Sequence, residues 1–171
     1  MDVHVREPAN RRARVAACGS PAAPPRDVSA GAMAPEAVIA LLREFSALLS
    51  EAVFAHDGTI DKFLGDGVMA VFGPPLPSQC DASNAARCAL DIKHAVDAWN
   101  ERRHRLGHFP IRVAIGIHYG EVVQGDIGSD RRPELTVLGS TVNIASRIEA
   151  YCRALDAAVL VSDAFIDALH A

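Results

Sequence analysis

Two short segments of the chain gather side chains that can do chemistry on a charged small molecule. The first, KFLGDG at residues 62–67, places Lys62 four residues before Asp66. An ammonium group only donates hydrogen bonds, whereas a carboxylate accepts them and is a preferred ligand of hard divalent cations. An Asp-Gly pair is also a common turn. Taken alone, the segment favours a turn residue at Asp66 over a metal ligand.

The second segment, ELTVLGSTVNIASRIEA, covers residues 134–150 and changes character at its glycine. Thr136 lies in the strand-like half, where a threonine is usually a β-former. Asn143 and Arg147 lie in the helical half, four residues apart and therefore on one face of the helix. A salt bridge to a helix neighbour is the plain alternative for Arg147.

The rest of the sequence supplies the elements that must position these segments. From Pro35 to about residue 55, apolar residues recur at three- and four-residue steps, which predicts a core-facing helix. The pattern then predicts a hairpin at 59–64 and 68–72, a helix from about 81 to 107, a buried strand at 111–119, a strand-rich stretch to 138, a helix from 139, a short strand at 157–161 and a last helix capped by Ser162. Helices alternate with hairpins, which favours an α+β fold with one sheet covered by helices.

The composition is that of one ordinary folded domain. The chain has 171 residues, of which 50% are hydrophobic and 22% charged, and this excludes a wholly disordered or fibrous protein. The net charge of −4 argues against a nucleic-acid partner, because such proteins present basic faces to phosphates. We expect no membrane segment, since no apolar run is long enough. Four cysteines without a CxxC pair favour a reducing, cytoplasmic location.

The first 32 residues differ from the rest. They are rich in proline and arginine and have neither helical nor strand-like apolar periodicity. We therefore expect residues 1–32 to be a disordered or non-homologous segment and residues 33–171 to form the domain.

The Lys-x-x-Gly-Asp hairpin is followed about 70 residues later by T-x-x-G-x-x-V-N-x-A-x-R. Together with IGIHYGEVVQGDIGS at 115–129, this closely resembles the catalytic domain of class III nucleotide cyclases, the adenylate and guanylate cyclase family. The resemblance covers residues 33–171. It implies a ferredoxin-like α+β fold and a head-to-tail homodimer or heterodimer with another cyclase domain, with active sites at the interface. The implied reaction converts ATP to 3′,5′-cyclic AMP and pyrophosphate, assisted by two Mg²⁺ or Mn²⁺ ions.

The resemblance also implies a role for each motif residue. Asp66 matches a metal ligand of the family. Lys62 matches the lysine that hydrogen-bonds the purine ring, and Thr136 matches the position that discriminates the purine, so the two together point to ATP. Asn143 matches the asparagine that orients the ribose. Arg147 matches the arginine that stabilises charge on the α-phosphate, for which a permanently charged, forked guanidinium is suited.

The sequence departs from the family at both ends. An apolar strand ending in Phe-x-Asp-Ile-x-Gly-Phe should precede the helix at 35 and supply the other metal-binding carboxylate. The nearest carboxylate is Asp27, which follows two prolines and lies too close to Pro35. We therefore expect the first strand to be missing and the two-metal site to be incomplete. We also expect the family's closing strands after the last helix to be missing.

Three interpretations of function stay open. The chain is an adenylate cyclase domain, a catalytically incomplete partner domain that contributes Lys62, Thr136, Asn143 and Arg147 across an interface, or an inactive remnant. The absent first carboxylate favours the second and third interpretations. The complete set of downstream motifs favours the first two.

Other candidate residues have plainer explanations. His104 and His108 have the i, i+4 spacing of a metal pair, but a solvated helix end accounts for them. His118 lies on a predicted buried strand and fits a hydrogen-bonded core histidine. Arg131 and Arg132 resemble the tip of the family's β-arm, and an exposed charged loop explains them nearly as well.

Overall fold

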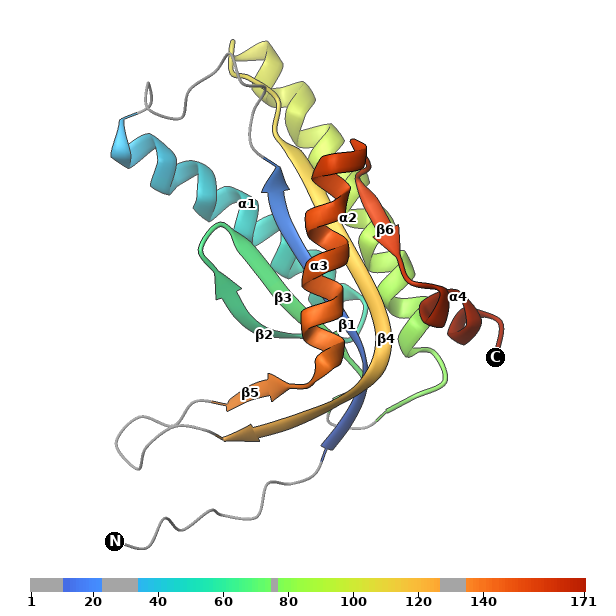
Figure 1. Cartoon of the computed structure of the whole chain (residues 1–171). Helices are drawn as coiled ribbons and strands as arrows, with labels where there is room; N and C mark the ends of the chain where they lie inside the picture. Colours follow the sequence, from blue (N-terminus) through green and yellow to red (C-terminus); the bar gives the residue numbers. More distant parts are fainter. Residues whose placement is uncertain (1–10, 23–33, 75–76, 127–134) are drawn as a thin grey trace, which may run out of the picture.

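The computed structural model describes residues 11–22, 34–74, 77–126 and 135–171. Its elements are β1 (Arg11–Ala22), α1 (Pro35–Ala55), β2 (Gly58–Leu64), β3 (Gly67–Phe72), α2 (Asp81–Arg105), β4 (Arg112–Asp126), β5 (Leu135–Leu138), α3 (Ser140–Leu155), β6 (Val159–Val161) and α4 (Asp163–Leu169). The strands form one sheet in the order β2-β3-β1-β4-β5, and β6 pairs in parallel with β4 (Figure 1). The predicted α+β fold is confirmed.

Helices cover both faces of the sheet. On one face, Phe45 of α1 packs in the same core as Phe72 of β3 and the apolar side of α2. On the other face, Ala145 of α3 packs with Val71 and Val122. Every residue of β3 is buried because the strand meets a helical layer on each side. Among the helices of the described ranges, none is long and apolar enough to cross a membrane.

The predicted elements recur with small changes in their bounds. α1 begins at Pro35, where the missing N–H costs nothing because the first turn leaves it unpaired. Ser162 caps α4, and its Oγ accepts a hydrogen bond from the backbone N–H of Phe165 at 3.3 Å. β4 runs on to Asp126, past the predicted end at Tyr119, because β1 and β5 pair with its later residues.

The prediction that the first strand is missing is wrong. β1 lies at the centre of the sheet, where it pairs with β3 from Val15 to Gly19 and with β4 from Arg11 to Ala22. Its own sequence carries no strand signal, so its conformation follows from the backbone donors and acceptors that β3 and β4 present on either side. Residues 1–10 and 23–32, the rest of the predicted disordered segment, lie outside the described residues.

Pro21 lies in β1, although proline is a residue type that central strands usually exclude. The pairing of β1 with β3 ends at Gly19, so Pro21 has a paired neighbour on the β4 side, at Val113, and lies beyond the β3 ladder. A proline at such a position behaves like one in an edge strand, where its missing N–H is tolerated.

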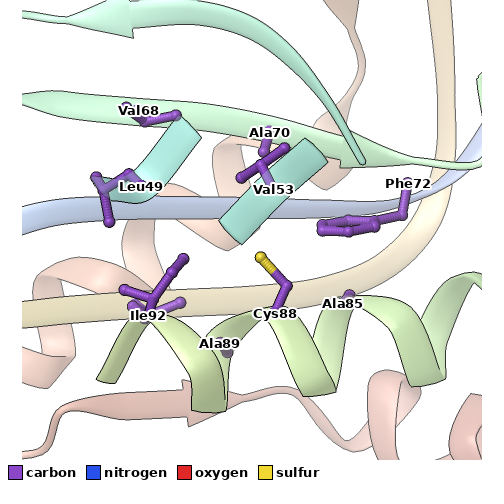
Figure 2. A pocket seen from close by; sticks show the side chains of 10 residues that line it. Leu49, Val53, Val68, Ala70, Phe72, Ala85, Cys88, Ala89 and Ile92 are labelled. Carbon is purple, nitrogen blue, oxygen red and sulfur yellow. The ribbon is translucent and has the colours of Figure 1, made fainter. Parts of the chain in front are cut away.

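A small apolar cavity of about 20 Å³ lies between α1, α2 and β3 (Figure 2). Val53, Phe72, Cys88 and Ile92 contribute to its wall. A space of this size holds roughly one water molecule, and an apolar lining gives that water no hydrogen-bond partners. The cavity is therefore a small packing gap in the core.

We expect the thiol of Cys88, beside this cavity, to be unreactive. Burial raises the pKa of Cys88 to about 12, and the thiolate is the form that reacts. Burial also raises the pKa of Cys152, whereas Cys80 is exposed. Iodoacetamide at about pH 8 should label Cys80 in the native protein and label Cys88 and Cys152 only after denaturation, as read by peptide mass spectrometry. Rapid native-state labelling of Cys88 would contradict the packing of α2 against α1.

Candidate functional site

Lys62 and Thr136 lie in contact, although they are 74 positions apart in the sequence. The Lys62 Nζ donates a hydrogen bond to the Thr136 Oγ1. Lys62 belongs to β2 and Thr136 to β5, which are the two ends of the strand order. The sheet joins them by curving: β4 bends along its length and carries β5 back beneath β2 (Figure 1). The structure therefore brings together the two residues predicted to read a purine.

Asp61 joins this pair and was not predicted. Its Oδ2 lies 3.4 Å from the Lys62 Nζ and accepts a 3.4 Å hydrogen bond from the Thr136 Oγ1. Its Oδ1 accepts a hydrogen bond from the backbone N–H of Val137 at 2.9 Å. The Asp61 side chain is 1% exposed, and a carboxylate buried to this degree requires such partners. Asp61, Lys62 and Thr136 form one network, which we call the β2–β5 cluster.

A bulge explains how Asp61 and Lys62 both reach Thr136. Successive side chains of a regular strand point to opposite faces. The pairing of β2 with β3 shifts register between Ile60 and Lys62, so Asp61 is an extra residue in the ladder. The bulge re-aims the chain at this point, and two consecutive side chains meet the same threonine.

Asn143 and Arg147 lie four residues apart on α3, as predicted, and both are exposed. The helix starts directly after β5 at Gly139, whose φ of 150° suits a residue without a side chain. The Thr141 hydroxyl holds the first turn by donating to the carbonyl oxygen of Glu121 at 2.7 Å. These contacts fix the start of α3 against β4, directly after the strand that contains Thr136.

Gly116 of β4 lets α3 approach the sheet closely. A Cβ at Gly116 would lie 2.2 Å from the backbone N of Glu149 and 2.4 Å from the carbonyl oxygen of Ala145. Atoms of a side chain do not fit in that space. The close packing of α3 against β4 therefore depends on this glycine, and the positions of Asn143 and Arg147 depend on that packing.

Asp66 lies exposed in the turn between β2 and β3, next to Gly65 with its φ of 63°. The β1–β3 pairing ends with Gly19 opposite Val68, which follows Asp66 by two residues. The end of β1 is thus the place from which a second carboxylate would come. The segment Arg11–Ala22 contains no Asp or Glu. Among the described residues, the end of β1 therefore offers no second carboxylate for a two-metal site.

Other candidate ligands can be placed within the described part of the chain. Within the described ranges, no group of three or more His, Cys, Asp or Glu side chains gathers to hold a metal ion. His118 is a hydrogen-bonded core residue, as predicted: its Nδ1 lies 2.7 Å from the Ser162 Oγ, and burial lowers its pKa. Asp27, Arg131 and Arg132 lie outside the described residues.

The chain belongs to the adenylate and guanylate cyclase catalytic domain family, whose sequence model matches residues 27–171. It is 40% identical over 132 residues to adenylate cyclase 1 of Rhizobium meliloti. The aligned region covers 77% of this chain and 20% of that protein. It is 32% identical over 139 residues to an adenylate cyclase of Anabaena cylindrica, which covers 79% of this chain and 27% of that protein. The chain therefore spans about a fifth to a quarter of the length of these relatives.

Solved structures of cyclase domains share the fold. The adenylyl cyclase CyaB from P. aeruginosa superposes with a TM-score of 0.82 at 27% identity, covering 94% of this chain and 82% of that one. The guanylyl cyclase Cya2 gives a TM-score of 0.78 at 31% identity, covering 93% of this chain and 79% of that one. The ferredoxin-like cyclase architecture expected from the motifs is thereby confirmed.

Proposed function

We propose that this chain is an adenylate cyclase-type domain that binds ATP and contributes to its conversion to 3′,5′-cyclic AMP and pyrophosphate, in cytoplasmic cyclic-nucleotide signalling. The contact between Lys62 and Thr136 is the observation that carries the proposal. A lysine donor beside a threonine hydroxyl matches a purine edge that offers a ring nitrogen and an amino group. The adenylate cyclases among the relatives support the same substrate.

In the proposed reaction, the ribose 3′-oxygen attacks the α-phosphorus. A bond forms between these two atoms, the bond from the α-phosphorus to the pyrophosphate oxygen breaks, and the proton of the 3′-hydroxyl passes to solvent water. Asn143 would orient the ribose for this attack. Arg147, a permanent cation on the same exposed face of α3, would stabilise the negative charge that builds on the α-phosphate.

We further propose that the chain supplies this half of an active site to a second cyclase domain, which supplies the metal-binding carboxylates. The absence of Asp and Glu from β1 beside the Asp66 turn favours this arrangement over a self-sufficient homodimer. Mg²⁺ or Mn²⁺ would then be held mainly by the second domain and would neutralise the phosphates there. The partner is another domain of the same family, paired head to tail.

Nucleotide binding by the whole chain tests the proposal without requiring turnover. Replacing Lys62 by Ala removes the ring donor, so ATP affinity should fall by about tenfold in a competition assay against a fluorescent ATP analogue. Lys93→Ala is the matched control, since Lys93 is a half-exposed lysine of α2 paired with Asp97 at 2.6 Å. Equal ATP affinities for the wild type and Lys62→Ala would contradict the assigned role.

A further inference from the structure

We propose that Asp61 sets the purine preference of the β2–β5 cluster by keeping the Thr136 hydroxyl as a hydrogen-bond acceptor. The inference rests on the proposed adenine-nucleotide function and deepens it. Asp61 is a positioning residue, because it acts through Thr136 and Lys62 and does not itself meet the nucleotide.

The Thr136 hydroxyl has a single proton to donate. That hydroxyl donates to the Asp61 Oδ2 at 3.4 Å and accepts from the Lys62 Nζ. A carboxylate has no proton to give, so the Thr136 proton stays directed at Asp61. The hydroxyl can then form further hydrogen bonds only through its lone pairs. Thr136 therefore faces a ligand as an acceptor.

Asp61 stays in place when a ligand enters. Its Oδ1 is held by the Val137 N–H at 2.9 Å, and its side chain is 1% exposed. Lys62 has 32% of its side chain exposed and a flexible stem, so it is the mobile member of the cluster. Thr136 is 1% exposed, and a base reaches its hydroxyl only when the Lys62 side chain swings away. Asp61 continues to orient Thr136 after that movement.

An acceptor beside a donor matches adenine and mismatches guanine. Adenine offers an amino group, which donates, next to a ring nitrogen, which accepts; the amino group would face Thr136 and the ring nitrogen Lys62. A 6-oxo purine in the same position turns a carbonyl towards Thr136 and an N–H towards Lys62. Both contacts then fail, and sites that leave polar groups unpaired discriminate strongly. A preference of about tenfold or more for ATP follows.

The wild-type chain provides the first test. ATP, ITP and GTP compete against a fluorescent ATP analogue, and ITP isolates the 6-position because it lacks the 2-amino group of GTP. ATP should bind about tenfold more tightly than ITP. Equal affinities for ATP and ITP would mean that Thr136 also donates, and this would overturn the inference.

Asp61→Asn tests the residue itself. The amide can donate to Thr136 and thereby free the threonine proton for a 6-oxo group, so the ATP-to-ITP preference should fall below about threefold. Asp97→Asn is the matched control, because Asp97 also pairs with a lysine but is 57% exposed on α2. Thr136→Val leaves only the Lys62 contact to discriminate, so the ATP-to-ITP preference should fall, and Asp61→Asn should add nothing in that background. A purely structural role of Asp61 would weaken both nucleotides alike and leave their ratio unchanged.

The outcomes separate this inference from the proposed function. A wild type that binds none of the three nucleotides contradicts the proposed function and the inference with it. Binding of ATP with an unchanged ratio in Asp61→Asn overturns the inference alone. Fluorescence of the one tryptophan, Trp99, verifies that each variant is folded. If Asp61→Asn does not fold, the wild-type ATP-to-ITP ratio and its response to Thr136→Val decide the question.

Discussion

Replacing Gly116 by Ala should destabilise the domain by at least about 3 kcal/mol, because the added methyl group overlaps backbone rather than side chain. The new Cβ would lie 2.2 Å from the Glu149 N and 2.4 Å from the Ala145 O. Neither atom moves unless α3 lifts from β4 as a unit. Since small domains have roughly 5–15 kcal/mol of stability in total, we expect a large fall in the urea midpoint.

Urea unfolding followed by Trp99 fluorescence measures this effect. Trp99 is buried in α2, where its Nε1 donates to the Glu44 Oε2 at 3.0 Å, so its emission reports loss of the core. Gly107→Ala is the matched control: Gly107 has a φ of 74° but nothing within 4 Å of an added Cβ. That change should cost about 1 kcal/mol from backbone strain alone. Equal losses for the two variants would mean that close packing at Gly116 does not position α3.

Replacing Arg147 by Ala should reduce cyclic AMP formation by a hundredfold or more whenever this chain supplies the phosphate-stabilising half of a site. Loss of one group aimed at developing charge commonly costs a factor of 10²–10³ in rate. Because Arg147 is exposed, its removal should leave the urea midpoint nearly unchanged. The measurement is the initial rate of cyclic AMP formation in a mixture with a catalytic partner domain, at saturating ATP and Mn²⁺.

Arg102→Ala serves as the control for Arg147, since Arg102 is an exposed arginine on α2. It should leave the rate within about twofold of the wild type. An Arg147→Ala chain that supports the full wild-type rate would show that Arg147 does not act on the α-phosphate.

The sequence predicted the parts of the fold that have strong local patterns. α1 follows from the spacing of Phe45, Leu49 and Val53, and α4 follows from its Ser162 cap. β1 could not be predicted, because alternation in RRARVAACGSPA is confined to the four residues from Arg12 to Val15 and its strand conformation depends on β3 and β4 alongside. Non-local pairing of this kind leaves no mark on the strand's own sequence.

The residues of the candidate site were also predicted only in part. The family motifs predicted Lys62 and Thr136, and the structure places the two side chains in contact. Asp61 was missed because a strand residue beside Lys62 is expected to point to the opposite face. The bulge between Ile60 and Lys62 reverses that expectation, and no feature of the sequence GTIDKFL marks a bulge. The only hint of its role in the sequence was an aspartate directly before a motif lysine.

For the predicted metal site, the sequence reasoning was right about the residue types of the first strand and wrong about the strand itself. The sequence predicted that the carboxylate of the first strand is absent, and β1, whose pairing with β3 ends at Gly19 opposite Val68, contains no Asp or Glu. The strand itself is present. The described residues thus keep the architecture of a cyclase domain, with a first strand that carries no carboxylate.

The central claim, that this chain is the nucleotide-binding half of a shared cyclase site, is tested most directly by a mixing assay. The purified chain is incubated with ATP and Mn²⁺ alone, and then with the catalytic domain of a related adenylate cyclase whose arginine matching Arg147 has been replaced by Ala. Each protein alone should form little cyclic AMP, and the mixture should form it at least about a hundredfold faster. Robust cyclic AMP formation by the chain alone, or none in the mixture, would contradict the account.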